Sequence, residues 1–336
     1  MQAFMQYYRV HSPHRHIIPK AVMSLLLLCT PVLAMDLSSE PISPINPDNQ
    51  LNQGKISLGR ELFHDPRLSS DNSISCASCH NLKDGGADDT NVSMGVSGAL
   101  GTANTPTVFN SSLNFAQFWN GRAANLNEQI NGPIHNPVEM NANWPLIVKR
   151  LSQDPTIRQQ FEAFYPDGVS TDNIRDAITE FERSLLTLNA PFDRWLRGEE
   201  SALNNEQKKG YRLFKSYGCI SCHQGTNVGG NMYAPFGAVK DISEYFNRRG
   251  TSLNDSDLGR YTITKDAADR YLFKVPSLRL ASRTAPYFHD GSVKDLESAI
   301  KIMGRFQLGR EIPDEHITAI SRFIGSLKGD HPELNQ

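Results

Sequence analysis

Apolar residues recur at helical spacing in several segments of this chain, and most clearly in residues 172–197. Their positions in this segment are Ile174, Ile178, Phe181 and Leu185. Intervals of three or four residues place side chains on one face of a helix. Asp172 is the expected N-cap, and we expect Pro191 to end or kink the helix.

Four further segments show helical patterns. One begins at Gly54, a second is "EQKKGYRLFKSYG" (206–218), and a third begins at Asp314. Residues 141–165 carry two short patterns. Because apolar positions spaced in this way mark the buried side of an amphipathic helix, the chain is expected to be mostly α.

The intervening segments have different compositions. Residues 81–114 and 225–290 are rich in Gly, Asn, Thr or Ser and predict long ordered loops. No alternating pattern is long enough to predict a sheet. Residues 35–53 predict an extended leader, and residues 198–207 a linker. We therefore predict an N-terminal domain over 54–198 and a C-terminal domain over 199–336.

The first residues predict a segment that is removed. Arg9, Arg15 and Lys20 precede the apolar run "AVMSLLLLCTPVLA", which ends at Ala34. A basic start, a short apolar core and a small final residue are typical of a secretory signal peptide. A membrane anchor is the alternative, although the run is short for a bilayer span. Residues 1–34 are interpreted as a signal peptide, so the expected location is the periplasm.

Charge and cysteine count narrow the function classes. The remaining 302 or so residues hold 31 Lys and Arg against 36 Asp and Glu, a net charge near −5. This balance gives no basic surface for nucleic acid. All four remaining cysteines lie in "CASCHN" (76–81) and "CISCHQ" (219–224), which leaves none for a disulfide framework.

Three interpretations of these two Cys-x-x-Cys-His boxes compete. A structural zinc site needs both cysteine pairs to meet in space. A thioredoxin-like motif needs a βαβ context, which the pattern lacks. Covalent c-type haem needs two thiols followed by a histidine for the iron, and this interpretation is favoured. Cys76, Cys79 and His80 then hold one haem. Cys219, Cys222 and His223 hold the other.

Two longer stretches resemble the bacterial di-haem cytochrome c peroxidases. They are "FAQFWNGRAANLNEQINGPIHNPVEM" (115–140) and "VPSLRLASRTAPYFHDGSVKDLESAIKIMGRFQLG" (275–309). The resemblance implies two cytochrome c-like domains, each with one covalently bound c-type haem. It also implies reduction of hydrogen peroxide by electrons from a small cytochrome c or a cupredoxin. Members of the family are often homodimers.

Carried over position by position, the resemblance assigns roles to further residues. Met303 matches the axial ligand of the second haem, and Trp119 the tryptophan between the haems. Glu139 and Gln129 match the distal pair over the first haem, where a carboxylate can move protons. The alternatives are a core Met, a core Trp and, for Gln129, a surface position. Asn104, Thr284 and Pro286 match oxygen ligands of a calcium ion.

The chain departs from the family at one position. The distal His that blocks the first haem in the family's resting state is matched by Val96, and residues 81–134 contain no His. Valine cannot bind iron, so the first haem is expected to be five-coordinate or water-bound. Met94 and His135 are the candidate substitutes. The alternative functions are a pure electron-transfer protein and a maturation-type oxidase of a protein substrate. Met303 argues against the oxidase, because in that branch of the family a tyrosine occupies the position of Met303.

Overall fold

The computed structural model describes residues 39–334, so the expected signal peptide lies outside the described residues. Helices dominate, as expected from the sequence. Those before residue 200 are α1 Gln53–Phe63, α2 Cys76–Cys79, α3 Leu126–Gln129, α4 Asn131–His135, α5 Trp144–Ser152, α6 Pro155–Glu162, α7 Thr171–Ser184 and α8 Pro191–Leu196. Those after it are α9 Asn205–Tyr217, α10 Ser243–Arg249, α11 Tyr261–Thr264, α12 Leu296–Ile302 and α13 Asp314–Gly325. A π-helical turn, Met303–Gln307, continues α12.

Two sequence-based predictions were wrong in detail. The segment 172–197, expected to be one helix that ends or kinks at Pro191, is two helices, α7 and α8. Ser170, rather than Asp172, caps α7 by accepting the Asn173 N–H. Pro191 begins α8, where its missing N–H leaves no helical bond unmade. A sheet also exists, because β1 Tyr233–Pro235 pairs antiparallel with β2 Leu272–Lys274. Strands of three residues are too short to produce an alternating pattern.

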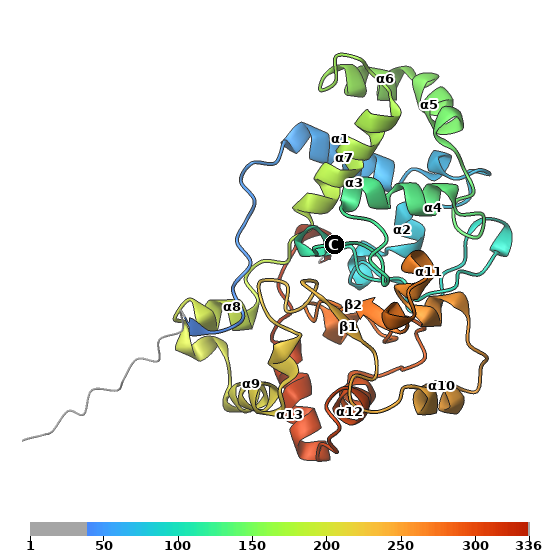
Figure 1. Ribbon diagram of the computed structural model, residues 1–336. Coiled ribbons are helices and arrows are strands. Elements are labelled where there is room, and N and C mark those ends of the chain that lie inside the picture. Colours follow the sequence, from blue (N-terminus) through green and yellow to red (C-terminus); the bar gives the residue numbers. More distant parts are fainter. Residues whose placement is uncertain (1–38, 335–336) are drawn as a thin grey trace, which may run out of the picture. The chain divides into compact units, whose positions relative to one another are not determined.

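Two helix pairs of the same design form the centres of the two halves (Figure 1): α1 packs on α7, and α9 packs on α13. A Cβ at Gly59 would lie 1.9 Å from the Ala177 carbonyl oxygen, and one at Gly210 would lie 1.9 Å from that of Ala319. Only glycine allows both contacts. The two pairs are therefore structural repeats, related by the same close approach of backbone to backbone.

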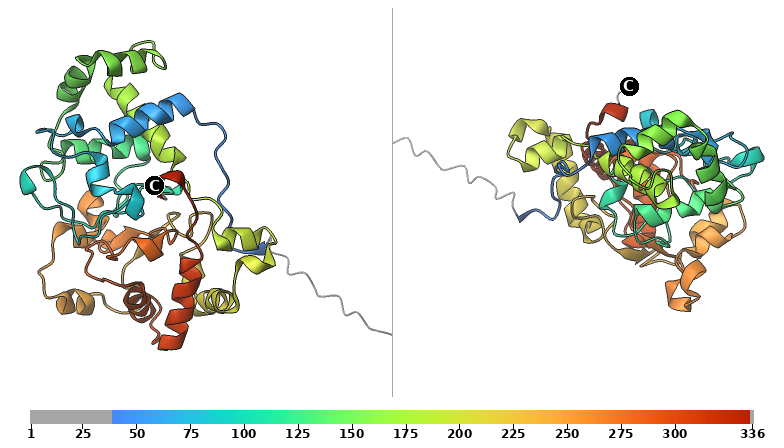
Figure 2. Two further views of the ribbon diagram at one scale, coloured as in Figure 1. Left: turned by 180° about the vertical axis from the view of Figure 1, so that it is seen from behind. Right: turned by 90° about the horizontal axis from the view of Figure 1, so that it is seen from above.

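The terminal segments cross between the halves. From behind as well as from the front, the segment before α1 runs toward α8 (Figure 2). Ile42 packs with residues of α9 and α13 in one hydrophobic cluster. Leu334, near the other terminus, packs with Phe63 and Phe109. The hydrophobic clusters therefore do not follow chain order, and the two halves share their terminal segments.

A buried ion pair anchors the leader. Arg279 and Asp193, both fully buried, form two charge-assisted hydrogen bonds of 3.0 Å each. Asp193 also accepts the Ile45 N–H, and Arg279 donates to the Ser43 carbonyl. The charges compensate one another, as buried charges must. Among residues 39–334, no helix is long and apolar enough to span a membrane.

Candidate haem sites

His80 follows directly after α2, in a position suited to binding iron. Its Nδ1–H donates to the Gly86 carbonyl at 3.1 Å, and the Phe63 ring lies 6.5 Å from its own. Burial lowers the pKa of His80, which favours the neutral imidazole. Because Nδ1 is used by the backbone, Nε2 is the nitrogen left for a metal.

His223 repeats this arrangement in the second half. It follows the 3-10 segment Cys219–Ser221 and donates from Nδ1 to the Val228 carbonyl at 3.3 Å. Phe214 lies 6.4 Å from its ring, as Phe63 does from His80. Burial lowers the pKa of His223 to about 4. Each half thus presents a neutral imidazole with a free Nε2.

None of the four cysteines of the described residues forms a disulfide. Burial raises the pKa of Cys76 to about 12 and that of Cys219 to about 11. Within residues 39–334, groups able to bind a metal converge only at Asp257, His289 and Asp290. The two cysteine pairs therefore do not meet in a common zinc site.

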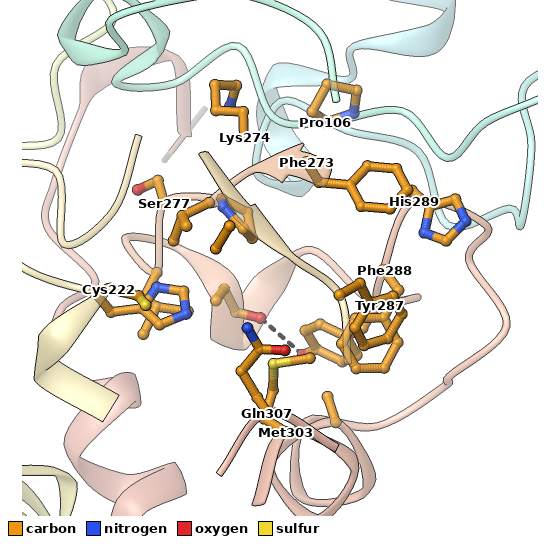
Figure 3. A pocket seen from close by; sticks show the side chains of 18 of the residues that line it. Pro106, Cys222, Phe273, Lys274, Ser277, Tyr287, Phe288, His289, Met303 and Gln307 are labelled. Atoms are coloured by element: carbon orange, nitrogen blue, oxygen red, sulfur yellow. Dashed lines mark hydrogen bonds between the residues drawn. The ribbon is translucent and has the colours of Figure 1, made fainter. Parts of the chain in front are cut away.

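A largely apolar cavity of about 280 Å³ adjoins His223. Cys219 lines this cavity. So do Cys222 and Met303, which Figure 3 labels, and Met303 is the first residue of the π-helical turn. A thioether, an imidazole and two thiols thus face one apolar space. This donor set is the one that a six-coordinate c-type haem requires.

Lys274 supplies a second indication that a ligand belongs in this cavity. Its side chain lines the cavity, only 7% of the residue is exposed, and burial lowers its pKa to about 8. Among the described residues its ammonium has no ion-pair partner. A buried cation of this kind needs a counter-charge, and the carboxylates of a haem would provide one. The residues present fit a haem. Lys274 was not predicted from the sequence, because its environment comes from distant segments.

Trp119 and the three predicted calcium ligands lie on the wall of the same cavity. These ligands are Asn104, Thr284 and Pro286. The Trp119 indole N–H donates to the Asn104 carbonyl at 2.8 Å, and the Trp119 carbonyl accepts the Lys274 N–H at 2.8 Å. The Asn104 amide nitrogen donates to the Thr90 carbonyl, which leaves its oxygen available for a cation. The structure thus brings Trp119 and the three residues together along one cavity.

Glu139 lies in the loop after α4. Asn136 Nδ2 donates to Glu139 Oε1 at 2.6 Å. Burial raises the pKa of this carboxyl, while the Asn136 bond and the Arg122 charge oppose the rise. The Glu139 charge in turn contributes to raising the pKa of Cys79, after burial and Asp88. Glu139 therefore lies within electrostatic range of the first haem-binding box.

Arg122 is a second charged group here that was not predicted from the sequence. Its guanidinium lies 3.3 Å from the centroid of the Phe118 ring, and burial lowers its pKa. It forms no ion pair within 4.0 Å among the described residues, although its charge acts on Glu139. The sequence offered one indication that Arg122 belongs to this site. Arg122 follows Trp119 by three residues in the stretch that resembles the family.

Val96 is buried at the centre of a tight loop. Its N–H donates to the Glu139 carbonyl at 2.8 Å, and Gly95 N–H donates to the Ala99 carbonyl at 2.7 Å. A Cβ at Gly95 would lie 2.2 Å from the Val138 carbonyl oxygen. The loop is therefore packed directly against the backbone that carries Glu139.

The remaining candidates occupy less specific positions. Gln129 is half-buried at the end of α3. Met94 pairs with Leu100 across the Val96 loop and is 63% exposed. His135 is exposed and lies edge-on to Trp144. The structure gives neither Met94 nor His135 a contact with His80.

The Asp257, His289 and Asp290 group already contains its own cation. Arg249 bridges Asp257 and Asp290 at 2.6 and 2.8 Å. His289 Nε2 lies 2.8 Å from Asp257 Oδ1, and its ring stacks on Phe273 at 4.5 Å. The guanidinium compensates part of the negative charge of the two carboxylates, so we interpret the group as a structural network.

Comparisons with known proteins agree with this chemistry. A family model described as di-haem cytochrome c peroxidase matches residues 53–201. The cytochrome c peroxidase Ccp of Escherichia coli is 47% identical over 87% of this chain, which spans 62% of that relative's length. The cytochrome c551 peroxidase of Nitrosomonas europaea is 43% identical, with 88% of this chain and 86% of the relative covered.

A solved structure has the same fold. The crystal structure of a MauG-like protein associated with microbial copper homeostasis aligns with a TM-score of 0.75 and 26% identity, covering 88% of this chain and 96% of that one. Together with the cytochrome c peroxidases, it shows that the similarity extends over both halves. The chain therefore belongs to the di-haem cytochrome c peroxidase family, in which its relatives named cytochrome c peroxidases are oxidoreductases acting on peroxide.

Proposed function

We propose that this protein reduces hydrogen peroxide to water in the periplasm, with electrons from a small cytochrome c or a cupredoxin. The reaction consumes one H₂O₂, two electrons and two protons and releases two waters. Two c-type haems would be held covalently, one by Cys76, Cys79 and His80 and the other by Cys219, Cys222 and His223. Family membership and the paired imidazole geometry support this assignment.

When bound, the first haem would supply an iron that binds peroxide, and the second an iron that accepts electrons. Met303 would bind the second iron together with His223, because its thioether shares a cavity with that imidazole. A thioether favours the reduced iron and raises its potential. Trp119 lines the same cavity and would lie between the two haems.

Glu139 would act as the acid/base of the first site. Cleavage of the O–O bond requires a proton to move from the inner to the outer oxygen, and a carboxyl of raised pKa can accept and return it. Asn136 orients this carboxyl through its 2.6 Å bond, and Arg122 provides positive charge nearby. Gln129 would orient peroxide through its amide.

The observation that carries the proposal is the pairing of Val96 with Glu139. The loop in which a blocking histidine would stand instead carries a buried valine, bonded to the backbone of the acid/base residue. The first site would therefore be open to peroxide in the fully oxidised protein. No reductive displacement of a ligand would be needed.

Asn104, Thr284 and Pro286 would bind calcium between the two haem sites, with water completing the shell.

The test of the proposed function is steady-state peroxide consumption by the oxidised holoprotein, with reduced cytochrome c as donor. Turnover without a lag supports the proposal. Absence of turnover with both haems present, with cytochrome c and with a cupredoxin, would contradict it. Sedimentation with and without calcium would test whether the protein forms a homodimer.

A further inference from the structure

Glu182 occupies an unusual position in the repeat that relates the two halves. A Cβ at Gly59 would lie 2.9 Å from the Cβ of Phe181 in α7, and one at Gly210 would lie 2.9 Å from the Cβ of Phe323 in α13. The residue after Phe181 in α7 is Glu182, and the residue after Phe323 in α13 is Ile324. The repeat therefore makes Glu182 the counterpart of Ile324.

Ile324 lines the cavity beside His223, so its counterpart is expected to line the first haem site. Cys76 packs against the hydrophobic cluster that contains Phe181, the neighbour of Glu182. The charge of Glu182 contributes, after burial, to raising the pKa of Cys76, and Cys76 is the counterpart of Cys219. A carboxyl thus stands in the wall of the first site where the second site has an aliphatic side chain.

The Glu182 carboxyl has an oxygen without a partner. Only 6% of the residue is exposed, and Oε2 is buried with no hydrogen bond. Burial alone raises the pKa of Glu182 to about 8. A buried carboxyl oxygen left unpaired normally carries a penalty, which suggests that it serves the ligand of this site.

Charged groups on the elements packed against α7 interact with residues other than Glu182. Lys55 pairs with Asp176 and Arg60 with Glu333. Glu61 accepts from Gln160, Glu128 accepts the Ala124 N–H, and Arg150 donates to the carbonyls of Arg67, Ser69 and Ser70. Asp48 pairs with Arg183, and His331 Nε2 donates to the Ser184 carbonyl. Lys149, on α5, contributes nothing to the pKa of Glu182. The charge state of Glu182 is therefore left to respond to the haem.

We propose that Glu182 is the proton-binding group coupled to electron uptake at the first haem. When the donor's electron reduces the iron from ferric to ferrous, the site loses one positive charge. The ionised carboxylate loses that attraction and takes up one proton from solvent, becoming a neutral acid. Reoxidation releases the proton. Ile324 cannot do this, so the coupling is confined to one of the two haems.

The inference rests on the proposed placement of the first haem, and its test uses potentials rather than turnover. We would measure the reduction potential of each haem by spectroelectrochemical titration of the holoprotein between about pH 6 and pH 9. The first haem's potential is expected to fall as pH rises, with a slope of up to about 59 mV per pH unit, the value of a tenfold change for a one-electron step. The second haem's slope should be smaller and serves as the internal control.

Glu182→Gln should flatten the pH slope of the first haem's potential. If the glutamine variant loses haem, Glu182→Ile is the replacement test. It places the residue of the second site, Ile324, in the first and should flatten the slope as well. Asp172→Asn, on the same helix but with an 84% exposed side chain, is the matched control and should keep the wild-type slope. An unchanged slope in a Glu182 variant that retains haem would overturn the proposal. A flat slope in the wild type would do the same. Neither result depends on whether the protein reduces peroxide.

Discussion

The backbone N–H of Val96 donates to the carbonyl oxygen of Glu139 at 2.8 Å. This bond joins the loop where a blocking ligand would stand to the loop that carries Glu139, the proposed acid/base residue. Gly95 makes the contact possible, because any Cβ there would collide with the Val138 carbonyl. The two loops are therefore packed together and would form one wall of the proposed first haem site.

Replacing Val96 by histidine should introduce a ligand for the first iron. We expect the oxidised Val96→His protein to show a low-spin first haem and a lag before peroxide turnover, where the parent shows a high-spin haem and no lag. Electron spin resonance and stopped-flow assays measure these properties. Val96→Leu, which adds bulk without a ligand, is the control. A parent protein whose oxidised first haem is already low-spin with two nitrogen ligands would refute the open-site interpretation.

Glu139→Gln should lower kcat by about 10²–10⁴-fold, the usual contribution of a positioned acid/base group. The amide keeps the shape of the side chain but cannot carry the proton. Steady-state assays at saturating donor measure the loss. Glu162→Gln, which changes an exposed carboxyl on α6, should leave kcat unchanged. Equal turnover in the Glu139 variant and the parent would remove Glu139 from the mechanism.

Removing the charge of Arg122 should shift the pH profile. The guanidinium favours the ionised form of Glu139 and so lowers its pKa. Arg122→Met should therefore raise that pKa and move the acidic limb of kcat/KM to higher pH. Arg122→Lys keeps the charge and should shift the limb less. A limb that stays in place in the methionine variant would show that Arg122 does not act on Glu139.

Met303→Leu should lower the potential of the second haem by roughly 0.1 V or more, because axial-ligand identity sets haem potentials over a range of about 0.8 V. Leucine preserves the volume of the side chain but not the sulfur. The visible spectrum should lose the signature of thioether ligation. Met94→Leu is the matched control, and its second-haem potential should equal that of the parent. If Met303→Leu behaved like the control, Met303 would be only a core residue.

Gly210→Ala should destabilise the protein by about 1–3 kcal/mol, as overpacking does, because the methyl group meets the Ala319 carbonyl oxygen at 1.9 Å. Gly325→Ala, in α13, meets nothing within 4 Å and should be neutral or stabilising by up to about 1 kcal/mol. Thermal unfolding of the two holoproteins compares them. Equal melting temperatures would show that α9 and α13 can separate without cost.

Local features were predictable from the sequence because they depend on neighbouring residues. The period of apolar positions located α1, α9 and α13, and the spacing of Cys76, Cys79 and His80 indicated covalent haem. Pro191 was misinterpreted, since a proline that ends one helix and a proline that begins another look alike when only the period is considered. The substitution at Val96 was visible from the resemblance alone.

Tertiary structure decided what depends on distant segments. The sequence could not show that Leu334 packs beside Phe63, that Arg122 acts on Glu139, or that Lys274 lines a cavity and has no ion-pair partner among residues 39–334. Nor could it show that Glu182 lies where the other half has Ile324. Periodicity reports which side of a helix is buried, but only the packing of α7 against α1 determines what that side meets. The short Cys-x-x-Cys-His spacing alone therefore predicts covalent haem at both boxes. The difference between the two proposed haem sites depends on residues from distant segments that the fold brings around each box.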